Sequence, residues 1–283
     1  MNFRRLCFNT FACLSLICFI GSSVCYLSYK NDLAYLKSVI QSQIGKEHSP
    51  HLFAAINHWV YQNQGFRKNH DFFLFKSLGP TPIQVLERGG DCSDKSRLLM
   101  AMLDSIDVDS TLVMLYDADN KTPTHTTLEV RNKQLKAVAD PVFDLVFPNP
   151  ANGFYGLQDL RDNPAILPDR LDELIRLRGP SNKIAFYKRE QESYQYATTI
   201  NWNKNGFLRF IADGLKKAGI EPRNIRRPHF LDEPKLLISL MLLLTGSLLL
   251  MPVLMIGRKT PVPAYTPGSA RVMPEQPRHP LRG

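Results

Sequence analysis

The strongest constraint on the fold is a pair of long apolar segments, one near each end of the chain. Residues 6–29 carry no charge and directly follow two arginines, and residues 236–256 are uncharged as well. A helix needs about 20 mostly apolar residues to cross the hydrocarbon core of a bilayer. We therefore expect transmembrane helices at 6–29 and 235–257, with a domain of about 200 residues between them.

The first segment has a second interpretation, a cleaved signal peptide. Its apolar run is long and no small-x-small cleavage site follows it. The stretch Ser22-Ser23-Val24-Cys25 is a poor lipoprotein signal because a valine precedes the cysteine. An uncleaved signal anchor is therefore favoured, although cleavage stays open.

The basic residues predict the orientation of both helices. Arg4 and Arg5 precede the first helix, and residues 258–283 hold five basic residues against one acid. Basic flanks stay in the cytoplasm, while long loops cross regardless of charge. We expect a two-pass protein of the bacterial inner (plasma) membrane, with both termini (1–5 and 258–283) cytoplasmic, the tail disordered, and a periplasmic or extracytoplasmic domain.

The net charge of +9 follows from this topology. Residues 1–30 hold three basic residues and no acid, and the tail contributes four net charges, which leaves +2 for the rest. The basicity is thus a membrane-orientation signal, and we expect no nucleic-acid partner.

Only one of the five cysteines lies outside the first apolar segment. That residue, Cys92, would meet oxidising conditions with no partner for an internal disulfide. A buried inert thiol is the simplest interpretation of a lone cysteine, but its retention outside the cytoplasm also suggests use. The other four are explained as apolar residues of the membrane helix: Cys7, Cys13, Cys18 and Cys25.

The central region divides into a helical stalk at 30–49, a core at 50–148, and a Pro-rich and helical extension at 149–234. Apolar spacing predicts helices at 52–62, 93–106 and 207–218, with a short helical turn at 83–87. Residues 66–82 and 141–180 are expected to be irregular, and 181–205 are ambiguous. Strands are expected at 111–116, 124–131 and 135–140.

The helix expected at 93–106 begins beside the cysteine. Asp91 or Ser93 can cap it, and Asp94 suits its first turn. Partial positive charge at a helix N-terminus stabilises a thiolate at Cys92. The two preceding glycines, Gly89 and Gly90, let the backbone turn sharply. The sequence therefore places a nucleophile at a helix start.

The hairpin downstream predicts a base and its partner. A two-residue turn at 132–133 would place His125 opposite Asp140, and Glu129 opposite Lys136 as a charge pair. A loop two residues longer would offset His125 from Asp140 by one diagonal step, still within reach. A histidine beside a carboxylate is held in one tautomer. Cys92, His125 and Asp140 then form a candidate nucleophile, base and orienting group.

These segments resemble the core of the transglutaminase-like superfamily. The similarity rests on Gly89-Gly90-Asp91-Cys92-x-Asp94-Lys95, Thr124-His125-x-x-Leu128-Glu129-Val130 and Ala139-Asp140-Pro141, and covers about residues 50–148. It implies an α+β, papain-like fold, with the cysteine-bearing helix packed on an antiparallel sheet, and thiol acyl chemistry. The family often has an aromatic residue where Thr127 stands, so this chain departs from the family pattern at that position.

Other candidate sites are weaker. Gln84 is a candidate side-chain donor to an oxyanion, at a loose spacing from the cysteine. His51, His58 and His70 lack a cysteine or carboxylate at ligand spacing, so we expect no zinc. The Asp117–Asn120 region lacks the glycine and terminal glutamate of an EF-hand loop, which favours a plain turn over calcium. No cofactor or metal is expected.

Two classes of function remain. The first is a cysteine-dependent acyl-transfer enzyme, a protease, amidase or transamidase, acting on a peptide, protein or cell-wall amide, with hydrolysis favoured over cross-linking. The second is a non-catalytic module that binds a partner or an envelope polymer. An assembly factor that processes a partner for envelope-polymer machinery is a variant of the first. Reactivity of the Cys92 thiol discriminates between the two classes.

Overall fold

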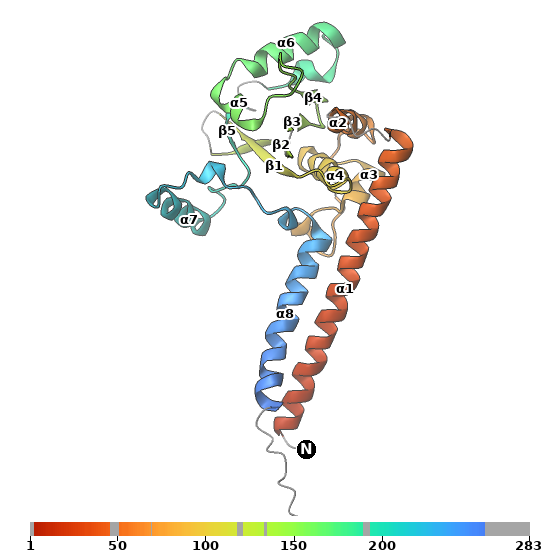
Figure 1. Cartoon of the computed structure of the whole chain (residues 1–283), viewed down its shortest axis with the longest axis vertical. Helices are drawn as coiled ribbons and strands as arrows, with labels where there is room; N and C mark the ends of the chain where they lie inside the picture. Colours follow the sequence, from red (N-terminus) through yellow and green to blue (C-terminus); the bar gives the residue numbers. More distant parts are fainter. Residues whose placement is uncertain are drawn as a thin grey trace, which may run out of the picture. The chain divides into compact units, whose positions relative to one another are not determined.

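The structure is a computed structural model that describes residues 3–45, 51–68, 70–117, 121–132, 135–188 and 193–257. The described residues divide into two compact units, one within 1–18 and 244–283 and the other within 19–243. Figure 1 labels the helices and strands. The expected cytoplasmic tail and the Ala118–Asn120 part of the expected turn lie outside the described residues. The larger unit contains the sheet and the helices packed on it.

Within the described residues, five strands form one antiparallel sheet in the order β4-β3-β2-β1-β5. The fold is therefore α+β, with a helix that starts at the cysteine packed against the central strands. The expected strands at 111–116, 124–131 and 135–140 are confirmed to within a residue or so. The strand bounds are β1 Ser110–Tyr116, β2 Pro123–Arg131, β3 Lys136–Asp140, β4 Leu145–Val146 and β5 Ser193–Thr198.

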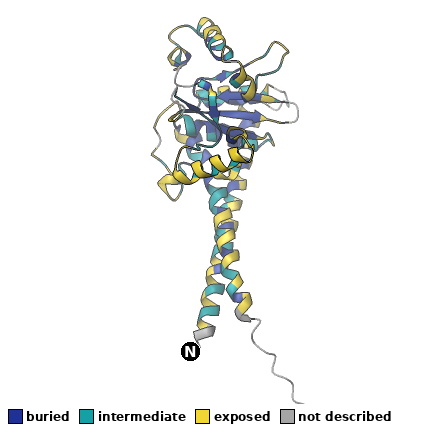
Figure 2. Cartoon of the chain, turned by 90° about the vertical axis from the view of Figure 1, so that its left-hand side faces the viewer, coloured by how far each residue is buried: buried dark blue, intermediate teal, exposed yellow. Residues whose placement is uncertain are grey.

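The sheet has helices on both faces because its apolar residues alternate. Leu112, Leu128 and Ala137 face one apolar cluster, which includes residues of helices α1 to α4. Val113 and Val138 face the other, which includes residues of α5 and α6. Figure 2 shows the resulting burial of the strands between the two layers. The helix bounds are α1 Phe3–Gln43, α2 Leu52–Gln62, α3 Pro82–Arg88, α4 Cys92–Asp104, α5 Leu157–Asp162 and α6 Ile166–Arg178.

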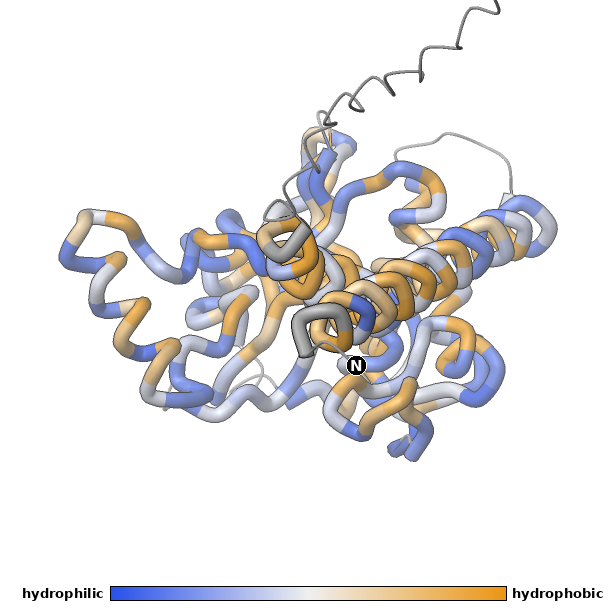
Figure 3. Tube along the Cα trace, turned by 90° about the horizontal axis from the view of Figure 1, so that it is seen from below, coloured by the Kyte–Doolittle hydropathy of each residue, from blue (hydrophilic) through white to orange (hydrophobic). Residues whose placement is uncertain are grey.

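Helices α1 and α8 (Pro234–Gly257) are long and apolar enough to cross a membrane, by length and composition. Figure 3 shows hydrophobic residues predominating along α1 near the N-terminus. In the larger unit, Ser22 Oγ donates to Ser239 O at 2.9 Å and Ser239 Oγ donates to Ser22 O at 2.9 Å. Each serine hydroxyl thus donates its hydrogen bond to the backbone oxygen of the other serine. Residues 31–43, expected to belong to a stalk, continue α1 without a break.

The helix predictions at 52–62, 93–106 and 207–218 are confirmed with small shifts, since the last is α7, Gly206–Lys217. The prediction of an irregular chain at 141–180 is wrong. Helices α5 and α6 lie there, and α6 buries Leu167, Leu171 and Leu174 at helical spacing. The expected loop at 66–82 contains one 3-10 turn, η1 Lys76–Leu78, and three others follow later: η2 Lys183–Phe186, η3 Pro222–Asn224 and η4 His229–Leu231.

The predicted register of the β2–β3 hairpin is wrong by two residues. Leu128 pairs with Ala139 and Arg131 with Lys136, so the connection spans four residues rather than two. Glu129 lies opposite Val138, and its carboxylate pairs with Arg131 at 2.8 Å instead of with Lys136. The physical reason is local: Leu135 N–H donates to Asn132 Oδ1 and Asn132 N–H donates to Leu135 O, which closes the longer loop.

Candidate active site

Cys92 is the first residue of α4, as the sequence predicts. Asp91 caps the helix, its Oδ1 accepting from Ser93 N–H at 2.9 Å and Asp94 N–H at 3.1 Å. Asp94 Oδ2 accepts a hydrogen bond from Asp91 N–H at 3.4 Å, which completes a capping box. As the first residue of α4, Cys92 has an N–H with no partner inside the helix, and this donor lies beside the thiol.

The glycines before Cys92 are required by space and by backbone conformation. Gly89 has φ +78°, and a Cβ there would lie 2.6 Å from Gln64 O. A Cβ at Gly90 would lie 2.4 Å from the Cβ of Asp94. Both positions exclude larger residues, so the chain can pass close to the α4 start.

Lys95 fixes α4 against α2 from one turn further along. Its side chain is buried, and its Nζ donates to Val60 O at 2.7 Å, Asn63 O at 2.9 Å and Tyr61 O at 3.2 Å. These carbonyls end α2, where a cation is favoured by the helix dipole. Burial, with a smaller contribution from Lys183, lowers the pKa of Lys95 to about 8. This lysine belongs to the motif around Cys92, but no structural or catalytic role is predicted for it from the sequence.

His125 and Asp140 meet across the hairpin by the diagonal step. His125 Nε2 lies 2.7 Å from Asp140 Oδ2, and both side chains are almost fully buried. Asp140 Oδ1 accepts from Val142 N–H at 2.8 Å and Phe143 N–H at 3.3 Å. The carboxylate is thus held by the backbone that follows β3, and it holds the imidazole in turn.

The Cys92 thiol lies close enough to the His125 imidazole to contribute to its pKa. Because Nε2 is used by Asp140, Nδ1 is the ring nitrogen left for the thiol. Burial opposes a charge on this ring, but the charge and hydrogen bond of Asp140 outweigh it, with a further contribution from Cys92, and raise the pKa of His125 well above 6.5. The described structure therefore brings all three sequence-predicted residues together. Ser96 Oγ donates to Thr126 O at 3.0 Å and ties α4 to β2 beside them.

Two aromatic rings cover the imidazole. Phe143 lies edge-on to His125 with ring centroids 5.6 Å apart, and Tyr187 lies edge-on at 6.2 Å. Tyr187 follows η2, and Lys183 at the start of η2 lies over the Phe143 and Phe66 rings. Phe143, Tyr187 and Lys183 are not among the site residues predicted from the sequence. Their region lacks clear periodicity, so no pattern in it pointed to the site.

The other sequence candidates have separate places. Gln84 Oε1 accepts from Thr81 N–H at 2.8 Å in the capping box of α3, which leaves its amide nitrogen as a donor. Its role at an oxyanion stays a prediction. His58 Nδ1 lies 2.9 Å from Asp144 Oδ2 at an exposed position. Among the described residues, no group of three or more His, Cys, Asp or Glu side chains could hold a metal ion.

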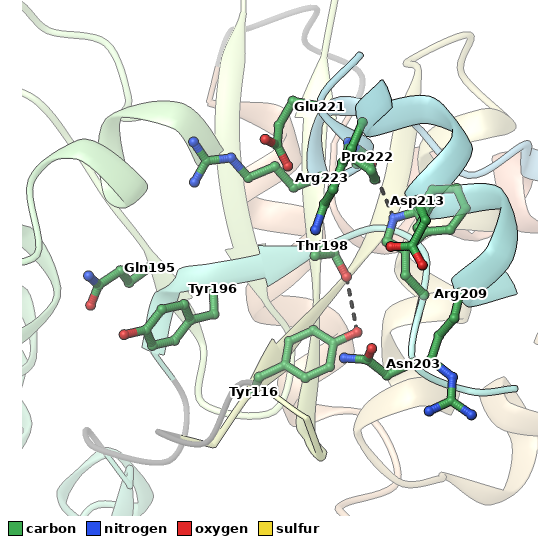
Figure 4. A pocket seen from close by; sticks show the side chains of 13 residues that line it. Tyr116, Gln195, Tyr196, Thr198, Asn203, Arg209, Asp213, Glu221, Pro222 and Arg223 are labelled. Atoms are coloured by element: carbon green, nitrogen blue, oxygen red, sulfur yellow. Dashed lines mark hydrogen bonds between the residues drawn. The ribbon is translucent and has the colours of Figure 1, made fainter. Parts of the chain in front are cut away.

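A cavity of about 560 Å³ lies elsewhere, between β5, α7 and η3 (Figure 4). Tyr116 Oη and Thr198 Oγ1 are hydrogen-bonded at 3.0 Å on its wall, and Trp202 Nε1 donates to Pro222 O at 3.1 Å. Arg209 and Arg223 also line it. None of the three sequence-predicted site residues contributes to this cavity.

No protein-family model matches the chain, and no curated protein matches its sequence. Two solved structures are similar over part of their length. A candidate cysteine protease from Cytophaga hutchinsonii is 19% identical with a TM-score of 0.33, and the match covers 43% of this chain and 40% of that one. The Rad4–Rad23 structure bound to a 6-4 photoproduct UV lesion is 13% identical with a TM-score of 0.35, covering 84% of this chain and 58% of that one. The chain thus spans less than two thirds of either.

Proposed function

We propose that this protein is a cysteine-dependent acyl-transfer enzyme with Cys92 as nucleophile, His125 as base and Asp140 as orienting group. The observation that carries the proposal is the buried His125–Asp140 pair, 2.7 Å apart, with Cys92 at the start of α4 close enough to raise the pKa of the imidazole. This is the nucleophile, base and orienter arrangement of covalent acyl transfer. The α+β core and the earlier sequence resemblance favour a papain-like, transglutaminase-like architecture.

The chemistry follows from these positions. The Cys92 proton passes to His125 Nδ1, and the sulfur adds to the substrate carbonyl carbon. The Cys92 N–H donates to the oxygen that becomes negative. The C–N bond then breaks, the departing amine takes the proton from His125, and a thioester remains. Water gives a proton to His125 and adds to the thioester, the C–S bond breaks, and the proton returns to sulfur. The net reaction is hydrolysis of an amide to an acid and an amine.

The surroundings support a membrane-bound role. We assign residues 6–29 and 235–257 to the two membrane helices, 30–49 to a stalk, 50–148 to the catalytic core and 149–234 to an extension of the same extracytoplasmic domain. Both termini would be cytoplasmic in a bacterial inner membrane. The substrate would then be a peptide, protein or cell-wall amide outside the cytoplasm, with an amine acceptor or envelope-polymer machinery as further partners.

The test is the rate at which Cys92 reacts with iodoacetamide in the full chain, solubilised in detergent. Trypsin releases Cys92 on residues 89–95 and the other four cysteines together on residues 6–30, so mass spectrometry reads them separately. We expect Cys92 in the wild type to react at least about tenfold faster near pH 6 than in His125→Ala, because only the thiolate is nucleophilic. If Cys92 reacts slowly, and at the same rate in the wild type and in His125→Ala, the catalytic proposal is rejected and a non-catalytic binding module is favoured.

A further inference from the structure

Lys183 is a cation placed at the candidate active site, and the ion pairs between described residues include none with its side chain. Its segment is fixed on both sides, since Asn182 Oδ1 accepts from Ile184 N–H at 3.1 Å and both Ile184 and Tyr187 are buried. The ammonium position is therefore set by the fold around η2 rather than by a mobile surface loop.

Three aromatic rings surround the Lys183 ammonium. Its Nζ lies 4.9 Å from the Phe66 ring centroid and 6.0 Å from those of Tyr61 and Phe143. An ammonium over the face of an aromatic ring is attracted by the negative charge of that face. The rings thus keep the charge over the site instead of letting it extend into solvent.

Two of those rings belong to the walls of the candidate site. Phe66 forms a β-bridge with Gly90, two residues before the nucleophile. Phe143 lies against His125. The Lys183 ammonium thus contacts one ring beside the cysteine loop and one ring beside the base.

Burial lowers the pKa of Lys183, and the charge of Asp140 only partly opposes this. The ion pairs of the described residues include none with Lys183, and the neighbouring carboxylate of Asp140 is already taken by His125 and two backbone N–H groups. Lys95 is a second cation close to Lys183, and the positive end of the α4 dipole lies at Cys92. The combination is one accessible point charge between apolar walls, which suits a single carboxylate with an attached carbon chain. A phosphate group more often uses the paired donors of arginine.

Resting on the proposed acyl-transfer function, we infer that Lys183 binds a substrate carboxylate close to the scissile amide. The substrate class is then an amide whose acyl or leaving part carries a free carboxylate, such as the last residue of a peptide or an acidic side chain. Lys183 acts as a specificity residue and takes no part in bond breaking.

The test compares anionic and neutral alkylating probes of the same shape at Cys92. The pairs are iodoacetate with iodoacetamide, and N-iodoacetylglycine with N-iodoacetylglycinamide, which places the carboxylate one residue further out. The full chain in detergent is digested with trypsin and the 89–95 peptide is quantified. We expect Lys183→Met to lower the anion-to-neutral rate ratio by about fivefold for at least one pair, the scale of one partly screened charge pair.

Matched variants separate a specific contact from a general field. Lys183→Arg should keep most of the ratio, and Lys188→Met, which removes the same charge from an exposed position on the same segment, should leave it unchanged. Ratios in Lys183→Met equal to the wild type for both pairs, or an equal drop in Lys188→Met, overturn the inference while leaving acyl transfer intact. A Cys92 that is unreactive towards all four probes overturns the proposed function, and this inference with it.

Discussion

Replacing Asp140 with asparagine isolates the contribution of one buried charge to the candidate site. Asparagine keeps an oxygen that can accept from Val142 N–H and Phe143 N–H, so the backbone after β3 stays satisfied. It presents an NH₂ group to His125 Nε2, where the carboxylate now lies at 2.7 Å. To accept that hydrogen bond the imidazole must carry its proton on Nδ1, and it then cannot take the proton of Cys92.

The size of the effect follows from the geometry. Two unit charges about 4 Å apart attract by about 4 kcal/mol at an effective dielectric constant of about 20, a suitable value for protein sites. Losing the carboxylate therefore removes most of the stabilisation of the His125 imidazolium. Each 1.4 kcal/mol is about tenfold in population, so the thiolate–imidazolium pair becomes rare. We expect Cys92 in Asp140→Asn to react with iodoacetamide at least about tenfold more slowly near pH 6.

The stability of the same variant should depend on pH in a defined direction. Because the pKa of His125 is raised in the folded state, its contribution is fully present below the unfolded value of about 6.5 and is lost as pH rises through the folded pKa. The gap in unfolding free energy between wild type and Asp140→Asn should therefore narrow as pH rises. Asp140→Ala should be less stable still, since each buried N–H left unpaired costs about 1–3 kcal/mol. If Cys92 in Asp140→Asn reacts with iodoacetamide as fast as in the wild type, both near pH 6 and as the pH rises, the reasoning is refuted.

Three further substitutions test the supports of the site by thermal unfolding and Cys92 alkylation. Lys95→Met removes the ammonium that bonds one buried and two part-buried carbonyls, and should lower the free energy of unfolding by about 1–3 kcal/mol; a loss well under about 1 kcal/mol would show that water replaces the ammonium. Gly89→Ala, with φ +78° and its Cβ against Gln64 O, should cost about 1–3 kcal/mol and slow alkylation; unchanged values would mean the loop shifts freely. Ser96→Ala removes the bond to Thr126 O and should cost about 1 kcal/mol with little change in alkylation, whereas a large rate loss would mean the tether positions the thiol.

The hairpin shows which part of the site the sequence could predict. Strand residues alternate between faces, so His125 and Asp140 had to share a face in any register that keeps Leu128 in the core. A shift of two residues preserves that sharing, and a shift of one would destroy it. The sequence could therefore predict that His125 and Asp140 share a face. It could not predict which residue lies directly opposite His125, because that depends on a loop closed by the Asn132 side chain, and apolar patterning carries no information about this loop.

The missed part of the site has a different physical cause. Lys183 and Tyr187 lie in a 3-10 turn and the extended segment after it, which bury one residue in three or four and leave no long periodic stretch. Their contacts with Phe66, Phe143 and His125 are long-range and aromatic. Helix α6 was missed for another reason, since its proline within the first turn reads as a breaker although that position tolerates it.

The energetic cost of this arrangement is itself an argument for function. A buried histidine–carboxylate pair loses hydration that its mutual attraction only partly restores, and apolar residues of similar volume often do as well or better for stability. The same few turns also bury Lys95, and burial raises the pKa of Asp94 to about 6. Ionisable groups with displaced pKa values gather at functional sites more than elsewhere. Helix capping explains Asp94 and the end of α2 explains Lys95, but neither explains a buried His125–Asp140 pair beside a thiol at a helix start. That pair therefore favours chemistry at Cys92 over a structural role.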